Sequence, residues 1–178
     1  MADRRLIRAG GWVAVAMAAL VAGCAQKQAP PPTPVQPIPI VRPALDPESY
    51  MAFTASSALF AIQASRMAEA RGSAKSKKVA PQIIMDQTGI GAQLSFAGRR
   101  IDLLPSSRVL PEHQTMLERL ATSSDFDSTY KAQLAKTLGE AAAAHRAFEA
   151  GGDSPTLRPV ARFAAPVCEK NLEAVRKL

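Results

Sequence analysis

The chain has 178 residues, and 47% of them are hydrophobic, as in a globular protein and unlike an intrinsically disordered one. Only 5% of the residues are aromatic and alanine supplies much of the apolar content, which favours closely packed helices over a β-sandwich. The formal net charge is +7, but within residues 46–178 basic residues exceed acidic ones by only three, which argues against nucleic-acid binding.

The first 24 residues are typical of a lipoprotein signal peptide. Three arginines make a basic start, and the apolar run over residues 9–22 is shorter than the about 20 residues that a membrane-spanning helix needs. The segment ends with Val21-Ala22-Gly23-Cys24, which resembles the lipobox of bacterial lipoproteins. In a lipobox the cysteine carries the lipid, and the signal peptide is cleaved just before it. We therefore expect residues 1–23 to be removed and Cys24 to carry the lipid. The alternative is an ordinary secretory signal whose mature chain begins with cysteine.

The sequence around the lipobox also predicts a location. Ala25 follows the cysteine, where an Asp would favour retention in the inner membrane, so we expect a lipid-anchored protein of the cell envelope, at the outer membrane and facing the periplasm. The pair Arg4-Arg5 leaves twin-arginine export open beside the general secretory route. With Cys24 lipidated, Cys168 has no partner for an intramolecular disulfide.

Residues 24–45 are predicted to be a proline-rich tether. Eight prolines lie between Pro30 and Pro47, a density that prevents a helix and favours an extended polyproline II segment rising about 3.1 Å per residue. The segment Pro34-Val35-Gln36-Pro37 also fits a PxxP docking motif, but the composition favours a spacer over a docking motif.

Residues 46–178 are predicted to form one helical domain. Asp46-Pro47-Glu48 has the cap and proline of a helix start, and Gly72 ends that helix. Ser73 caps a second helix, which contains Pro81 early in its length. The predicted buried stripes are Phe53, Ser57, Phe60, Ala64 and Met67 in the first helix, and Val79, Ile83, Gln87, Ile90 and Leu94 in the second.

Three more helices follow a loop over residues 98–109. A short one begins at Pro111 and contains Met116, Leu117 and Leu120. The fourth ends at Gly151-Gly152, and Ser154-Pro155 is predicted to start the fifth. Their stripes are Phe126, Tyr130, Leu134, Leu138, Ala141, His145 and Phe148, then Leu157, Ala161, Ala164, Cys168, Asn171 and Val175. Four long helices with short connections predict an all-α, antiparallel four-helix bundle with an additional short helix.

The domain resembles a family of envelope-associated helical bundles, the domain of unknown function 4142. The resemblance lies in the order and spacing of several short segments over nearly the whole domain, and it implies a ferritin-like bundle. The segments are Met85-Asp86, Leu117 to Leu120, Asp125-Phe126-Asp127 with Tyr130, His145-Arg146-Ala147-Phe148, Gly152-Asp153, Leu157, and Pro166-Val167 with Asn171-Leu172.

The chain departs from the family pattern at three histidine positions. Family members often carry histidine where this chain has Gln87, Leu138 and Asn171, and only His145 keeps its imidazole. A di-metal site in a ferritin-like bundle needs paired Glu-x-x-His motifs, and neither His113 nor His145 has Glu three residues before it. We therefore predict no metal site and no cofactor.

The remaining polar residues on the stripes are the candidate site. Gln87, His145 and Asn171 should face the bundle interior, where they either hydrogen-bond one another and fix helix register or line a small-ligand cleft. A hydrolase would need Cys168 with His145, or Ser56 or Ser57 near His145, and a buried cysteine in apolar surroundings is inert.

The sequence predicts a non-enzymatic envelope lipoprotein that is attached to the membrane by its N-terminal lipid and binds an envelope partner or supports the envelope. A periplasmic small-ligand binder is the alternative, and a hydrolase or metalloenzyme ranks third.

Overall fold

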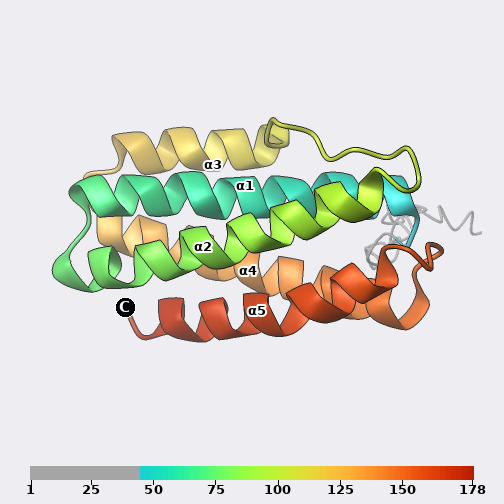
Figure 1. The fold of residues 1–178 in the computed structure, drawn as a ribbon. Coiled ribbons are helices and arrows are strands. Elements are labelled where there is room, and N and C mark those ends of the chain that lie inside the picture. The colour runs from blue at the N-terminus through green and yellow to red at the C-terminus, as the bar shows by residue number, and fades with distance from the viewer. Residues whose placement is uncertain (1–44) are drawn as a thin grey trace, which may run out of the picture. The chain divides into compact units, whose positions relative to one another are not determined.

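The structure, a computed structural model, describes residues 45–178, which contain five α-helices and no β-strand. Four long helices lie side by side, and the short third helix packs outside them against α1 and α4 (Figure 1). This confirms the predicted all-α bundle. None of these helices is both long enough and apolar enough to cross a membrane. The helices are α1 (Pro47–Arg71), α2 (Ala74–Gly98), α3 (Pro111–Thr122), α4 (Phe126–Gly151) and α5 (Arg158–Arg176).

The start and the end of α1 follow the predicted signals. A carboxylate oxygen of Asp46 accepts a hydrogen bond from the backbone N–H of Ser49 at 2.8 Å, and Pro47 occupies the first turn. The helix ends at Gly72, where a Cβ atom would lie 2.7 Å from the carbonyl oxygen of Ala68. Glycine is therefore required here because the chain passes so close to the preceding turn.

The predicted buried stripe on α1 is right at Ser57, Phe60 and Ala64 and wrong at its two ends. Phe53 and Met67 are only partly buried, whereas Tyr50, Met51 and Ser65 are buried. The reason is that α1 packs against three helices, α2, α3 and α4, so its buried face is wider than one stripe. Periodicity alone indicates the helix but not how many neighbours surround it.

Asp127 in the first turn of α4 joins that helix to the start of α2. Its carboxylate accepts hydrogen bonds from the backbone N–H of Ser73, at 3.0 and 3.1 Å, and from the hydroxyl of Ser76. These bonds, led by the one from Ser76, lower the pKa of Asp127. The three residues hold the helix ends together at this end of the bundle.

The predicted start of α5 at Ser154-Pro155 is wrong. Residues 155–157 form a turn and α5 begins at Arg158. The hydroxyl of Ser154 accepts from the backbone N–H of Leu157, so the serine caps a turn instead of the helix. Pro159 has no N–H to bond to the carbonyl of Pro155, which interrupts the hydrogen-bond ladder between the turn and the helix.

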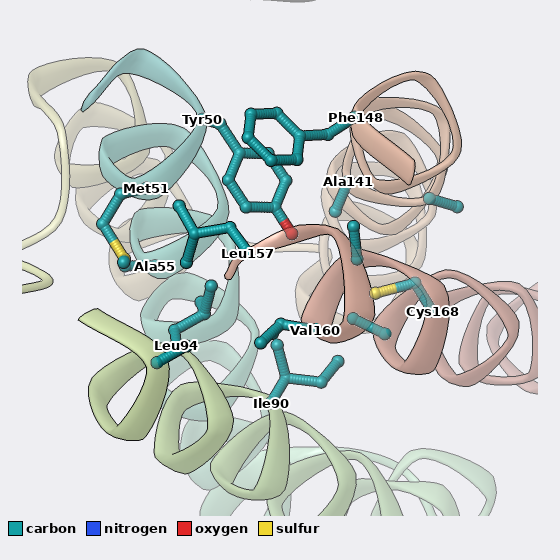
Figure 2. Close-up of a cluster of buried hydrophobic side chains, with 14 residues drawn as sticks. Tyr50, Met51, Ala55, Ile90, Leu94, Ala141, Phe148, Leu157, Val160 and Cys168 are labelled. Carbon is teal, nitrogen blue, oxygen red and sulfur yellow. The ribbon is translucent and has the colours of Figure 1, made fainter. Parts of the chain in front are cut away.

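The core consists of two clusters of buried apolar side chains, one toward each end of the bundle. Figure 2 shows the first cluster, in which the ring of Tyr50 stacks on Phe148 with ring centres 3.8 Å apart and its hydroxyl points into the cluster. Residues 45–178 belong to one compact unit that contains both clusters. The predicted signal peptide, lipidation site and tether, apart from Leu45, lie outside the described residues.

Candidate functional site

Gln87, His145 and Asn171 are all buried in the bundle, on α2, α4 and α5 respectively. No hydrogen bond within residues 45–178 joins any two of them. Gln87 instead contacts Cys168, and His145 contacts Tyr50. The three residues therefore do not form one polar cluster: Gln87 and His145 have different partners, and no side-chain hydrogen bond of Asn171 is found within residues 45–178.

His145 pairs with Tyr50 of α1. The Tyr50 hydroxyl oxygen lies 2.9 Å from Nδ1 of His145, and the two rings meet edge to face. Burial raises the pKa of Tyr50, so the phenol keeps its proton. The imidazole tautomer decides whether the phenol donates to Nδ1 or accepts from an Nδ1–H group. Burial also lowers the pKa of His145 to about 4, which keeps the imidazole neutral at neutral pH. A neutral imidazole with Nδ1 as acceptor carries its proton on Nε2.

Gln87 donates a weak hydrogen bond from Nε2 to the sulfur of Cys168 at 3.8 Å. Cys168 is buried, and its burial raises the pKa of the thiol to about 11 although the bond from Gln87 opposes that shift. A thiol with this pKa is almost entirely protonated at neutral pH, and the thiolate is the nucleophile. A weak hydrogen bond to a buried, protonated thiol is typical of packing in the core and not of a reactive cysteine.

Asn171 lies one turn beyond Cys168 on α5, and its side-chain Nδ2 has no hydrogen-bond partner within the described chain. Near it on α5, Lys170 reaches across to Asp86 of α2, with 4.0 Å between Nζ and Oδ2. Oδ1 of Asp86 accepts from Gln82, whereas Oδ2 is buried without a hydrogen bond. Polar groups thus line the contact between α2 and α5, but only some of their atoms have hydrogen-bond partners.

A second buried polar group was not predicted from the sequence. The hydroxyl oxygen of Ser56 on α1 lies 2.6 Å from Nδ1 of His113 on α3 and accepts from the backbone N–H of Leu110 at 2.7 Å. Because a hydroxyl oxygen has two lone pairs, Ser56 can accept from Leu110 and still either donate to Nδ1 or accept from an Nδ1–H group, according to the imidazole tautomer. Burial lowers the pKa of His113, and the effect exceeds the opposing attraction of Glu112. His113, Leu117 and Leu120 step by four and three residues, and this stripe is the signal that could have placed His113 inside.

This arrangement corrects the serine pairing expected for a hydrolase. Ser56 contacts His113 and not His145, and the hydroxyl of Ser57 donates to the carbonyl of Phe53 in its own helix. Ser56 and His113 are both buried, and Phe60 stacks on the His113 ring with 5.3 Å between centres. The serine and histidine are in contact but no open surface reaches them.

Several other buried side-chain atoms lack hydrogen-bond partners within residues 45–178. They are Nε2 of His113, both polar side-chain atoms of Gln133 and the hydroxyl of Thr137. Gln133 and Thr137 are one turn apart on α4, and the charged side chains of Lys136 and Glu140, on the same helix, lie close enough to affect the pKa of His113. No group of three or more His, Cys, Asp or Glu residues within the described chain could hold a metal ion.

An exposed apolar surface lies on the outer side of α2. Met85 is 62% exposed and Phe96 is 60% exposed, and both lie on one face of the helix with Gly89 and Ala92 between them. Phe163 of α5 is 48% exposed, and with Phe96 it lines a groove of about 440 Å³ between the two helices. We call these five residues the α2 face. Large exposed apolar side chains that gather in this way mark interaction sites.

The comparisons with known proteins identify a family but no characterised relative. No curated protein and no solved structure matches the chain. The model of the family described as "Domain of unknown function (DUF4142)" matches residues 40–178, which include all five helices and every residue of the polar contacts described above. The chain therefore belongs to the DUF4142 family.

Proposed function

We propose that this protein is a lipid-anchored, non-enzymatic component of the bacterial cell envelope that acts by binding a protein partner through the α2 face. The observation that carries the proposal is the contrast between the inside and the outside of the bundle. The groups capable of chemistry are buried, whereas Phe96 and Phe163 are exposed at one groove and Met85 is exposed three turns earlier on the same face of α2. When a partner covers a surface apolar side chain of this size, its burial contributes about 1.5–3 kcal/mol to the free energy of binding.

The anchor rests on the sequence before the domain. The apolar run ends at Val21-Ala22-Gly23-Cys24, and Ala25 favours sorting to the outer membrane over retention in the inner membrane. Twenty residues separate Cys24 from Leu45, the first described residue, which is enough extended chain to hold the domain several tens of Å from a membrane. A domain held in this way can reach partners in the periplasm.

The non-enzymatic character is supported by the surroundings of each nucleophile or base. The Cys168 thiol has a pKa of about 11, so little thiolate is present at neutral pH. Ser56 is engaged by His113 and Leu110 in the interior, and His145 is engaged by Tyr50. Catalysis at any of these groups would require the bundle to open before a substrate could approach.

Small-ligand binding is the second candidate, and one observation favours it. Gln87 lies at a groove of about 340 Å³ between α1 and α2, with Ala55, Leu59 and Gly91 among its neighbours. His145 and Asn171 do not line that groove, so a ligand there would meet only one of the three predicted polar residues. The α2 face offers more exposed apolar surface and is therefore our first choice.

The proposal can be tested in bacterial cells that process lipoproteins. Mass spectrometry of the membrane fraction should find an N-terminal peptide that begins at an acylated Cys24, and an intact N-terminus without lipid would contradict the anchor. A photo-crosslinking amino acid at position 96 or 163 should give discrete protein adducts. The same amino acid at position 104 is the control, because Leu104 is exposed but lies outside the α2 face. Equal labelling at all three positions, or none, would contradict the binding surface.

A further inference from the structure

A basic groove lies between the start of α2 and the end of α5, at the end of the bundle where the chain finishes (Figure 1). It has a volume of about 510 Å³ and is lined by four lysines, Lys75, Lys78, Lys170 and Lys177. We propose that this groove, which we call the lysine groove, docks the domain on the surface of an anionic phospholipid bilayer. The contact is separate from the α2 face and adds a second binding surface to the proposed function.

The lysines of the groove are available to an external anion. Lys75, Lys78 and Lys177 are exposed, and none of them forms an ion pair within residues 45–178. Lys170 is exposed too, and its Nζ lies 4.0 Å from Oδ2 of Asp86, which is a loose ion pair. Ammonium groups held in this way can exchange water for phosphate oxygens without breaking a close internal contact.

Basic side chains outnumber the carboxylates on this surface. Lys77 and Arg176 extend it beside the groove, and both are exposed. The carboxylates that line the groove are those of Glu173 and of the chain end at Leu178. Asp127 lies near Lys77, but its carboxylate already accepts hydrogen bonds at the start of α2. The surface therefore keeps an excess of positive charge, which attracts anions.

The lysines at the start of α2 do not stabilise their own helix. Helix N-termini favour acidic side chains and disfavour basic ones because of the helix dipole, yet the first turn of α2 contains no acidic residue. Lys75, Lys77 and Lys78 instead lie within the first five residues of the helix. Residues that work against a local preference point to a role outside the local structure, and binding of an external anion supplies one.

The apolar part of the groove favours a bilayer over a wholly polar anionic polymer. Val79, Ala174 and Leu178 line the groove between the lysines, and each is partly exposed. A bilayer surface presents phosphate groups beside acyl chains. Lysine side chains place their ammonium groups at the phosphates while their stems and neighbouring apolar side chains contact the less polar layer. A polymer such as peptidoglycan would leave the apolar part of the groove in water.

The proposed tether is long enough for this contact. Leu45 precedes α1 and Lys75 follows its end, so the tether and the lysine groove lie at opposite ends of that helix. With its 25 residues, α1 is about 38 Å long. The 20 residues between Cys24 and Leu45 reach about 60 Å when extended. The groove can therefore touch the membrane that holds the lipid. This step rests on the proposed anchor, whereas the charge argument does not.

Vesicle binding tests the inference without the lipid. The chain from residue 24 onward with Cys24→Ser carries no acyl group, so any binding comes from the protein itself. It should cosediment with vesicles of phosphatidylethanolamine and phosphatidylglycerol in about 50 mM NaCl, and not with vesicles of phosphatidylcholine. Binding should fall steeply as NaCl rises to about 500 mM, because salt screens the lysines.

Charge reversal locates the contact on the protein. Lys75→Glu combined with Lys78→Glu should lower the partition coefficient at least about tenfold, because each basic residue near an anionic surface strengthens binding several-fold. Arg99→Glu combined with Arg100→Glu is the matched control. It makes the same change in net charge on exposed residues at the other end of α2, and it should lower the partition coefficient by less than about twofold. Far-ultraviolet circular dichroism should show that both variants keep their helices.

A single tryptophan reports which part of the domain meets the bilayer. Trp12 is the only tryptophan in the sequence, so the chain from residue 24 onward has none. Leu178→Trp places the indole in the lysine groove, and its emission should shift to shorter wavelength when the anionic vesicles are added. Leu104→Trp is the control, because Leu104 is exposed beyond the other end of α2, and its emission should not change.

Three results would overturn the inference. One is absence of binding to the anionic vesicles at low salt. Another is an equal loss of binding in both charge-reversal variants, which would mean that net charge and not the lysine groove drives the interaction. The third is cosedimentation with isolated peptidoglycan but not with vesicles, which would replace the bilayer by a polar polymer. Photo-crosslinking at positions 96 and 163 tests the α2 face separately, so either proposal can fail while the other stands.

Discussion

The hydroxyl of Tyr50 in the first turn of α1 is hydrogen-bonded to Nδ1 of His145 near the end of α4, across 2.9 Å, and this bond joins two residues that are 95 positions apart in the chain. The Tyr50 ring also stacks on Phe148, one turn further along α4. One residue therefore contributes both an apolar contact and the polar partner of a buried histidine.

Tyr50→Phe keeps the ring stacking and removes only the hydroxyl. Nδ1 of His145 then loses its hydrogen-bond partner inside the core, and we expect the free energy of unfolding to fall by about 1–3 kcal/mol in urea denaturation. Tyr50→Phe combined with His145→Leu removes both polar partners, so part of the lost stability should return. An unchanged urea midpoint for Tyr50→Phe would contradict the hydrogen bond.

The stability of the domain should fall as the pH falls from about 6.5. The pKa of His145 is lowered by burial from 6.5 to about 4 in the folded state, and burial lowers the pKa of His113 in the same direction. The unfolded chain therefore binds more protons than the folded chain below pH 6.5, and the contribution of His145 is lost progressively down to about pH 4. For His145 alone the loss amounts to about 3 kcal/mol.

Urea unfolding at several pH values between 7.5 and 5 measures this dependence, because ordinary carboxylates titrate mostly below that range. His145→Gln should reduce the slope of stability against pH and leave the part that comes from His113. A stability that is independent of pH over this range would show that the two imidazoles are not buried in the neutral form.

Cys168 should react slowly with thiol reagents in the folded protein. Its pKa of about 11 leaves little thiolate at pH 8, and the residue is buried. With Cys24→Ser in place, we expect labelling by iodoacetamide to be slower than that of a free cysteine by at least about a hundredfold, and to become fast in urea. Rapid labelling of the folded chain would indicate an accessible thiol and would reopen the case for chemistry at this site.

Asn171→Leu should be tolerated, and it is expected to raise stability. Nδ2 of Asn171 is buried without a partner within the described chain, and an unsatisfied buried donor costs about 1–3 kcal/mol. Gln87→Leu should have little effect, because Gln87 donates only a weak bond to a thiol. Thermal unfolding of each variant and of the pair measures the changes. Marked destabilisation by Asn171→Leu would mean that its amide binds a group that the protein needs.

The fold class could be predicted from the sequence because the signals for it are local. Asp46 and Ser73 act as helix caps in the structure as predicted, and the stripe from Phe126 to Phe148 is buried at every position named. Caps depend on a few neighbouring residues, and amphipathic spacing depends on one helix at a time. Burial of Gln87, His145 and Asn171 followed from the same spacing.

The contacts between helices were decided only by the tertiary structure. Helical spacing places His145 inside but cannot say that it meets Tyr50 rather than Ser56, because the partner depends on how far α1 and α4 are shifted along each other. The same limit hid the contact of Ser56 with His113, which requires α3 to lie on α1. Met85 and Phe96 lie off the predicted buried stripe of α2, and only the tertiary structure shows that no other helix covers them.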